Sequence, residues 1–179
     1  MIREKAKNIT KDIHKYVEKS PIMIKIMDKT VTPKEYVDYL NQLEQIYKFF
    51  EENDIFKTFG WISLYSKCLE DIEEIESTHM VKRSEVKDET NMYLNYLESM
   101  KDNKTVICAH AYVRYMADLF GGQIMKRQLT KAGYPTNVYD FYGDVKTIRG
   151  VIATAIEECD ETLFVCESHH AFTCYTLIL

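Results

Sequence analysis

Apolar positions along this chain recur every three or four residues, and that spacing predicts amphipathic helices throughout. The longest such run surrounds residues 109–123, which read AHAYVRYMADLFGGQ. Apolar residues at helical spacing flank its glycine pair on both sides: Ile107, Ala111, Tyr115 and Leu119 before it, Ile124 and Leu129 after it. We therefore predict one long helix through Gly121 and Gly122, with a helix that ends at Gly121 as the alternative.

Prolines and capping residues divide the rest of the chain into further helices. A first helix over residues 2–19 ends before Pro21, because the residue preceding a proline avoids the α-helical region. The sequence TPKE at residues 32–35 is a capping box, and it begins a helix that runs to about Asn53. Further helices are expected over residues 62–75 and 81–100, from about residue 144 and from about residue 160, with turns at 101–103 and 133–135.

The composition favours one all-α domain over residues 1–179. A chain of 179 residues, 46% of them hydrophobic, can bury a substantial core. Six glycines and three prolines leave little scope for a turn-rich β architecture. The net charge of −5 argues against general nucleic-acid binding, so we expect no nucleic-acid partner. We also expect a monomer.

The cysteines and the two termini indicate a soluble cytoplasmic protein. Five cysteines without a CxxC pair suggest neither a disulfide framework nor a structural metal site. The amino terminus carries no apolar stretch of the kind that a secretory signal contains. The apolar residues 175–179 are too few to span a bilayer, so they are read as a helix end or the remainder of a removed segment.

Two local patterns point to a ligand. The first 29 residues are locally basic, and within them Lys7, Lys11 and His14 lie at i, i+4 and i+7 on one helical face. Such a face suits a ligand with anionic groups, although it is also typical of ordinary solvated helix. Two adjacent glycines inside a helix, each costing about 0.5–1 kcal/mol relative to alanine, indicate a kink or a close approach to the backbone.

Together these two segments resemble the heme oxygenase family. The family has a basic first helix of the form K-x3-K-x2-H and a later A-H-A-Y-x-R-Y-x-G-D-L-x-G-G-Q motif, which residues 109–123 match at almost every position. The similarity extends over nearly the whole chain, including residues 31–32 and 45–47. It implies a single-domain helical bundle with heme b sandwiched between the first, proximal helix and a Gly-kinked distal helix.

The resemblance implies roles for residues on the proximal side. His14 is expected to be the axial ligand of the heme iron, which a neutral imidazole binds through one ring nitrogen. Glu18, one helical turn later, is the expected hydrogen-bond acceptor for the other nitrogen. The residues expected to face the heme propionates and so fix the rotation of the heme are Lys7, Lys11, Tyr112, Lys146 and Arg149.

The resemblance also implies roles on the distal side. Without side chains at Gly121 and Gly122, the main chain can approach the heme face closely. Asp118 is expected to organise water that delivers a proton during the reaction. Arg114 and Tyr47 are expected to belong to the same polar network.

The chain departs from the family pattern at three places. Ala117 stands where the family has glycine, and Phe120 stands where a small residue is usual. The asparagine of the family's distal network has no match within residues 163–172, where Cys166 or Glu167 falls nearby.

The function implied is that of a heme oxygenase, which cleaves heme with O2 and electrons to biliverdin, carbon monoxide and Fe²⁺. One alternative is a heme-binding protein of the same fold with weak or no turnover, because of Ala117 and Phe120. Another is a non-heme relative of the thiaminase or di-iron type. Against it, we find no convincing E-x-x-H pair and no cysteine with an evident activating base.

The electrons are expected to come from a separate redox partner, a ferredoxin or an NADPH-dependent flavoprotein reductase. The chain contains no flavin, nicotinamide or iron–sulfur fingerprint. Basic residues of the first helix, Lys15 and Lys19 among them, are expected to steer such a partner towards the heme edge.

The remaining polar clusters are interpreted as structural. His110 is expected to be a structural residue and His79 a surface one. The neighbours His169 and His170 cannot point the same way on a helix, which argues against a joint metal site. The acidic run at residues 70–76 is expected to be solvated surface.

Overall fold

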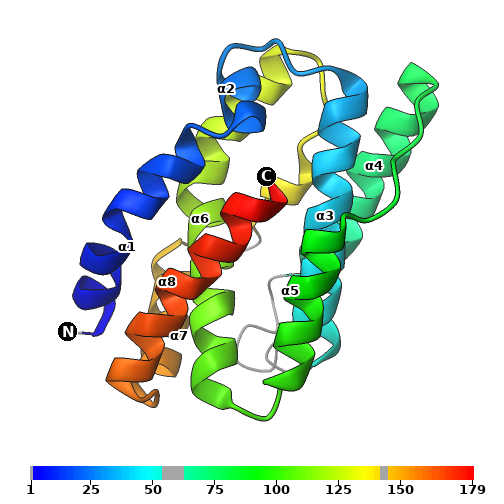
Figure 1. The fold of residues 1–179 in the computed structure, drawn as a ribbon. Helices are drawn as coiled ribbons and strands as arrows, with labels where there is room; N and C mark the ends of the chain where they lie inside the picture. Colours follow the sequence, from blue (N-terminus) through cyan, green and yellow to red (C-terminus); the bar gives the residue numbers. More distant parts are fainter. Residues whose placement is uncertain (1, 54–62, 142–144) are drawn as a thin grey trace.

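A computed structural model of the chain describes residues 2–53, 63–141 and 145–179. Within these ranges all regular secondary structure is helical, with no strand (Figure 1). The elements are α1 (Ile2–Glu18), α2 (Pro21–Met27), α3 (Pro33–Glu52), α4 (Tyr65–His79), α5 (Asp88–Ser99), α6 (Lys104–Lys131), the short 3-10 helix η2 (Asn137–Tyr139), α7 (Val145–Glu157) and α8 (Glu161–Ile178).

Several helices begin at the capping residues that the sequence contains. The hydroxyl oxygen of Thr32 accepts the Glu35 backbone N–H at 3.3 Å, and the Glu35 carboxylate accepts the Thr32 backbone N–H at 2.9 Å. This complete capping box, followed by Pro33, begins α3 as predicted. Asn103 and Asp160 cap α6 and α8 in the simpler way, each through one side-chain oxygen.

Helix α6 is continuous through the glycine pair. It runs unbroken from Lys104 to Lys131, so the prediction of one long helix is confirmed and the alternative end at Gly121 is wrong. The chain turns only afterwards, at Gly133, whose φ of +87° lies in the region that favours glycine.

The predicted helix over residues 81–100 begins later than expected. Residues 81–87 are not helical, and α5 starts at Asp88. Side chains of α3 bind the backbone of this segment instead: Asp38 accepts the Ser84 N–H at 2.7 Å and Gln42 accepts the Lys87 N–H at 3.0 Å. These tertiary hydrogen bonds satisfy backbone groups that a helix would otherwise satisfy. The short helices α2 and η2 were not predicted.

The helices pack around α6, which runs behind α8 in Figure 1. α8 packs against α6 on one side and α1 on the other, while α4 packs along α3. The largest fully buried side chains join these layers; they are Tyr36, Tyr47, Tyr115, Tyr139, Phe50 and Phe164. In the part of the chain that the structure describes, no helix is both long and apolar enough to cross a membrane.

One member of the acidic run at residues 70–76 is not solvated surface. Asp71 is fully buried, and its carboxylate accepts the backbone N–H groups of Asn137 and Val138, each at 2.9 Å. Burial raises the pKa of Asp71, and these hydrogen bonds oppose the rise. The carboxylate therefore holds η2 on α4, and η2 places Tyr139 against α6.

Candidate functional site

A cavity of about 620 Å³ lies between α1, α6 and the carboxyl end of α8. This volume falls within the range of about 300–1,000 Å³ that is usual for small-molecule sites. Its walls are mainly apolar; they include Val17, Met23, Met27, Val113, Met116, Ile124, Met125, Phe172 and Leu179. Polar groups face it from α1 on one side and from α6 on the other.

The α1 wall presents the predicted axial histidine. Lys7, Thr10, His14 and Glu18 line the cavity at helical spacing. His14 Nδ1 lies 3.4 Å from a Glu18 carboxylate oxygen, and the side chains of His14 and Glu18 are 50% and 61% exposed. The His14 ring meets the edge of Phe172 on α8, with the centroids 5.5 Å apart. With Nδ1 turned to Glu18, Nε2 is the nitrogen left to bind a ligand.

The α6 wall presents a buried ion pair. Arg114 Nε donates to Asp118 Oδ2 at 2.8 Å, and Arg114 Nη2 donates to Oδ1. The Tyr47 hydroxyl of α3 also donates to Oδ2. Asp118 is 1% exposed and Arg114 is 7% exposed, so three hydrogen bonds compensate the burial of this carboxylate. The predicted network of Tyr47, Arg114 and Asp118 is thus assembled in the structure.

The donors of this network stay protonated. Burial by itself would lower the pKa of Arg114, but Asp118 outweighs it and raises that pKa well above its ordinary value. Burial, followed by the charge of Asp118, raises the pKa of the Tyr47 hydroxyl well above its ordinary range. The Arg114 guanidinium lies 5.0 Å from the ring centroid of Tyr175 on α8, within the range of a cation–π contact.

The two glycines of α6 meet different surroundings. A Cβ built on Gly121 would meet nothing within 4 Å, and Gly121 lines the cavity. A Cβ on Gly122 would lie 2.7 Å from Cδ1 of the buried Tyr139. Gly121 therefore leaves room for a ligand, whereas the steric requirement at Gly122 comes from the protein's own η2 segment rather than from the cavity.

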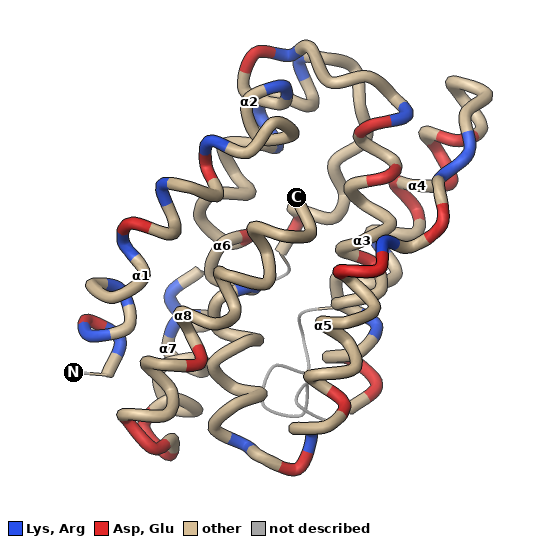
Figure 2. The backbone as a smooth tube through the Cα atoms, viewed as in Figure 1, with Lys and Arg blue, Asp and Glu red and all other residues tan. Residues whose placement is uncertain are grey.

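The residues predicted to face propionates divide into two groups. Lys7 and Tyr112 line the cavity. Lys11, Lys146 and Arg149 are exposed and are not among the lining residues. Arg149 lies near the rim, because its guanidinium is 5.7 Å from the ring centroid of Phe120, which does line the cavity. In Figure 2 the blue Lys and Arg positions recur along the backbone of α1, with red acidic positions between them.

Both departures from the family motif face the cavity. Ala117 and Phe120 are among its lining residues, so neither change is absorbed on the far side of α6. Sequence reasoning missed Tyr39, Phe172 and Tyr175, which also line the cavity. For Phe172 and Tyr175 a signal existed, because they continue the three- and four-residue spacing that starts at Phe164.

The histidines outside the cavity are only partly as predicted. His110 is fully buried and hydrogen-bonded, as a structural residue should be. Glu167, which lies near the position of the missing asparagine, contacts His110 and does not line the cavity. Glu167 and His170 form an E-x-x-H pair, contrary to the expectation that the chain has no convincing one, and the structure brings both side chains together with His110.

Comparisons with known proteins agree with this arrangement. The sequence model of the family described as heme oxygenase matches residues 2–178. A heme oxygenase of Takifugu rubripes is 25% identical over 142 residues, covering 73% of this chain and 51% of the relative. Heme oxygenase 1 of Gallus gallus is 27% identical over 142 residues, covering 73% of this chain and 48% of the relative. The chain thus spans about half the length of these relatives.

Solved structures show the same fold. Heme oxygenase from Leptospira interrogans has a TM-score of 0.83 at 22% identity and covers 99% of this chain and 97% of its own. Heme oxygenase-1 from the cyanobacterium Synechocystis, solved in complex with heme, has a TM-score of 0.82 at 19% identity, with coverage of 99% and 90%. By the match over nearly its whole length, the chain belongs to the heme oxygenase family.

Proposed function

We propose that this chain is a heme oxygenase that binds heme b between α1 and α6. It would convert the heme, with O2 and electrons from a separate donor, to biliverdin, carbon monoxide and Fe²⁺. The observation that carries the proposal is one cavity with an imidazole on one wall and a buried carboxylate network on the other. Family membership and the heme bound to the Synechocystis relative support it.

The residues of the cavity suit heme as a ligand. Its apolar walls match a flat, largely apolar macrocycle, and Lys7 offers a cation for the carboxylate edge. His14 would ligate the iron through Nε2, while Glu18 on Nδ1 sets the tautomer and the ring orientation. Once bound, heme supplies the iron that activates O2 and is also the molecule that is degraded.

The α6 wall supplies position and proton transfer. Arg114 and Tyr47 hold the Asp118 carboxylate in one orientation beside the cavity, where it can order water. A proton relay of this kind contributes about 10²–10⁴ in rate. Gly121 adds no side chain to this wall, so the backbone of α6 can approach the bound group.

A second candidate function is heme binding with weak or no turnover. It is favoured by the position of Ala117 and Phe120 on the cavity wall, where the family carries smaller residues. The added methyl and phenyl groups take up space on the side of the cavity from which O2 would react.

Reconstitution with hemin separates the two functions. The protein would be reduced with ascorbate or a reductase while the Soret band is followed. Decay of that band with growth of biliverdin absorption supports the oxygenase, and a stable band supports heme binding alone. No heme binding at all would contradict both. The variant His14→Ala should lose the imidazole signature of the ferric spectrum, and an unchanged spectrum would refute the axial-ligand assignment.

The electron donor is proposed to dock near α1. Lys15 on α1 and Lys19 directly after its end are exposed, and an acidic ferredoxin or reductase would be steered towards them. Charge reversal at both lysines should slow electron transfer and flatten its salt dependence. Lys82→Glu, in the segment between α4 and α5, is the matched control. If the double reversal left the rate and its salt dependence unchanged, this docking surface would be wrong.

A further inference from the structure

His110, Glu167 and His170 form a cluster outside the heme cavity. They come from α6 and α8, and one ligand atom from each lies within 4.8 Å of the other two. Glu167 Oε2 is 3.0 Å from His110 Nε2 and 3.4 Å from His170 Nδ1. None of the three residues lines the cavity.

We propose that His110, Glu167 and His170 bind a divalent first-row transition-metal ion, for which Zn²⁺ is the best match. Two imidazoles and one carboxylate are a donor set that zinc and ferrous sites use, whereas Mg²⁺ and Ca²⁺ prefer oxygen ligands alone. The site would leave one coordination position for water. It goes beyond the proposed heme chemistry and does not depend on it.

The spacing of the ligand atoms supports this assignment. Ligands about 2.0–2.2 Å from a tetrahedral zinc ion are roughly 3.3 Å from one another. The two contacts of Glu167 Oε2 with the imidazoles, 3.0 and 3.4 Å, already have this separation. An ion could therefore replace the protons between these atoms with only small side-chain movements.

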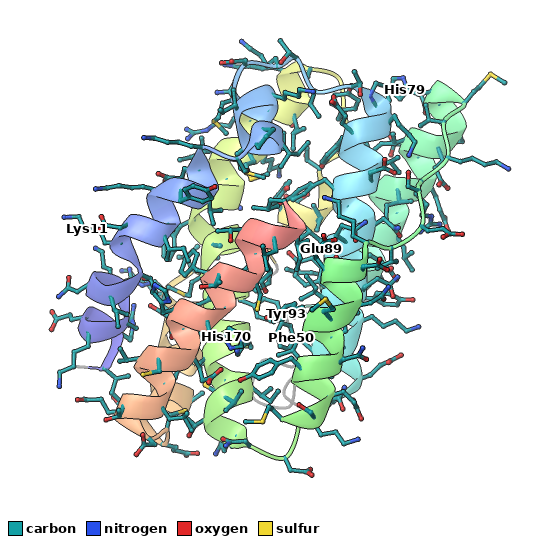
Figure 3. All side chains as sticks on the ribbon, in the orientation of Figure 1. Lys11, Phe50, His79, Glu89, Tyr93 and His170 are labelled. Carbon is teal, nitrogen blue, oxygen red and sulfur yellow. The ribbon has the colours of Figure 1, made fainter. Side chains whose placement is uncertain are left out.

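The surroundings of the cluster hold its ligands in place. The Tyr93 hydroxyl of α5 lies 2.8 Å from His110 Nδ1, so the nitrogen of His110 that faces Glu167 is the one free to bind metal. The Tyr96 hydroxyl donates to Glu167 Oε2 at 2.7 Å. Figure 3 shows Tyr93 on α5 and His170 on α8 in the region between these two helices.

The cluster is also partly open to solvent. The His170 side chain is 41% exposed, so an ion can reach the cluster from solvent.

The site would also connect α8 to the buried network of Tyr47, Arg114 and Asp118. His110 lies one helical turn before Arg114, which pairs with Asp118 one turn further on. Tyr93, which contacts His110, also packs against Tyr175 with the ring centroids 5.6 Å apart. A metal ion at the cluster would thus tie α8 to the part of α6 that carries the buried ion pair.

Calorimetric titration of the full chain with Zn²⁺, with and without heme, tests the proposal. We expect one equivalent to bind in both states, and Mg²⁺ not to compete. His170→Ala and Glu167→Gln should each weaken binding by more than about tenfold, since each removes a direct ligand. Tyr93→Phe should weaken it by about 10–100-fold, as a change beside a ligand does.

Two controls make the result specific. His169→Ala removes the neighbouring exposed imidazole, and His14→Ala removes the imidazole of the α1 wall; neither should change the zinc affinity. Co²⁺ should give the visible spectrum of a four-coordinate site without thiolate charge transfer, which excludes cysteine ligation. The proposal is overturned if the protein does not bind one equivalent of Zn²⁺. It is equally overturned if His170→Ala, shown by circular dichroism to be folded, binds Zn²⁺ as tightly as the wild type.

Discussion

The two walls of the cavity are built in different ways. On α1 the paired side chains of His14 and Glu18 are about half exposed, with 3.4 Å between His14 Nδ1 and a Glu18 carboxylate oxygen. On α6 the pair of Arg114 and Asp118 is almost completely buried and is joined by the Tyr47 hydroxyl. An exposed pair contributes little to stability, whereas breaking a buried one leaves an uncompensated charge. The protein's own buried contacts therefore hold the α6 wall, the distal wall, whereas the exposed pair adds little to the stability of the α1 wall, the proximal wall.

The variant Asp118→Ala should show this difference most strongly. This change leaves the buried Arg114 guanidinium without its carboxylate partner, and we expect a loss of about 3–5 kcal/mol in the free energy of unfolding, measured by urea denaturation. Replacing both residues together, as Arg114→Met with Asp118→Leu, should recover most of this loss. A single variant as stable as the wild type would show that the distal wall is not held by this pair.

The glycine pair tests the distal wall at a smaller scale. Gly122→Ala places a methyl group against Tyr139, and we expect a loss of about 1–3 kcal/mol in the free energy of unfolding, as for other overpacked sites. Gly121→Ala meets open space and should stabilise α6 by up to about 1 kcal/mol, because alanine favours helix.

Heme affinity, measured by Soret titration, separates the two glycines further. Gly121→Ala should weaken heme binding, since Gly121 lines the cavity. Equal melting temperatures for the two alanine variants would contradict the assignment of Gly122 to packing against Tyr139.

The pH dependence of the free energy of unfolding tests a further buried residue of α6, His110. Burial lowers the pKa of His110 below its ordinary value of 6.5, so the unfolded chain takes up a proton there before the folded chain does. Stability should therefore fall as pH drops below about 6.5, with His110 contributing at most about 1.4 kcal/mol per pH unit. Chemical denaturation between pH 7 and pH 5 measures this slope. It should be shallower in His110→Gln than in the wild type.

Stability should also change in a second pH range, below about pH 4.5, because of Glu167. The pKa of Glu167 is lowered from 4.5 to about 2, so its contribution to stability is present above pH 4.5 and is lost as pH falls towards 2. Glu167→Gln should remove this part of the acid transition. An acid transition identical to that of the wild type would rule out a stabilising role for the charge of Glu167.

The smallest effect is expected on the proximal wall. Glu18→Ala breaks an exposed pair and should change the free energy of unfolding by less than about 1 kcal/mol. The same variant should nevertheless alter the ferric heme spectrum, because His14 loses the acceptor that orients its ring. A large loss of stability in the heme-free protein would remove the contrast between the two walls.

Much of the helical framework follows from local signals in the sequence. The capping box at Thr32 and Glu35 predicts a helix start that the structure confirms. The predicted turn at 101–103 and the predicted start near residue 160 agree with the helices that Asn103 and Asp160 cap. These signals work because each satisfies backbone groups only a few residues away. The segment at residues 81–87 was predicted wrongly, since its backbone groups are satisfied by Asp38 and Gln42 of a distant helix.

The sequence by itself determined the family motif and the residue types that face one another across the cavity, His14 on one helix and Asp118 on another. The tertiary structure alone decided which of two adjacent glycines is open to the cavity, because Tyr139 reaches Gly122 from the η2 segment, which is held by Asp71 of α4 and by Gln123 of α6. It also decided that His110 meets Glu167 and His170, since the packing of α8 on α6 brings together ligands that lie far apart along the chain. Local hydrogen bonds can be read from neighbouring residues, whereas contacts between helices depend on how all of their side chains pack.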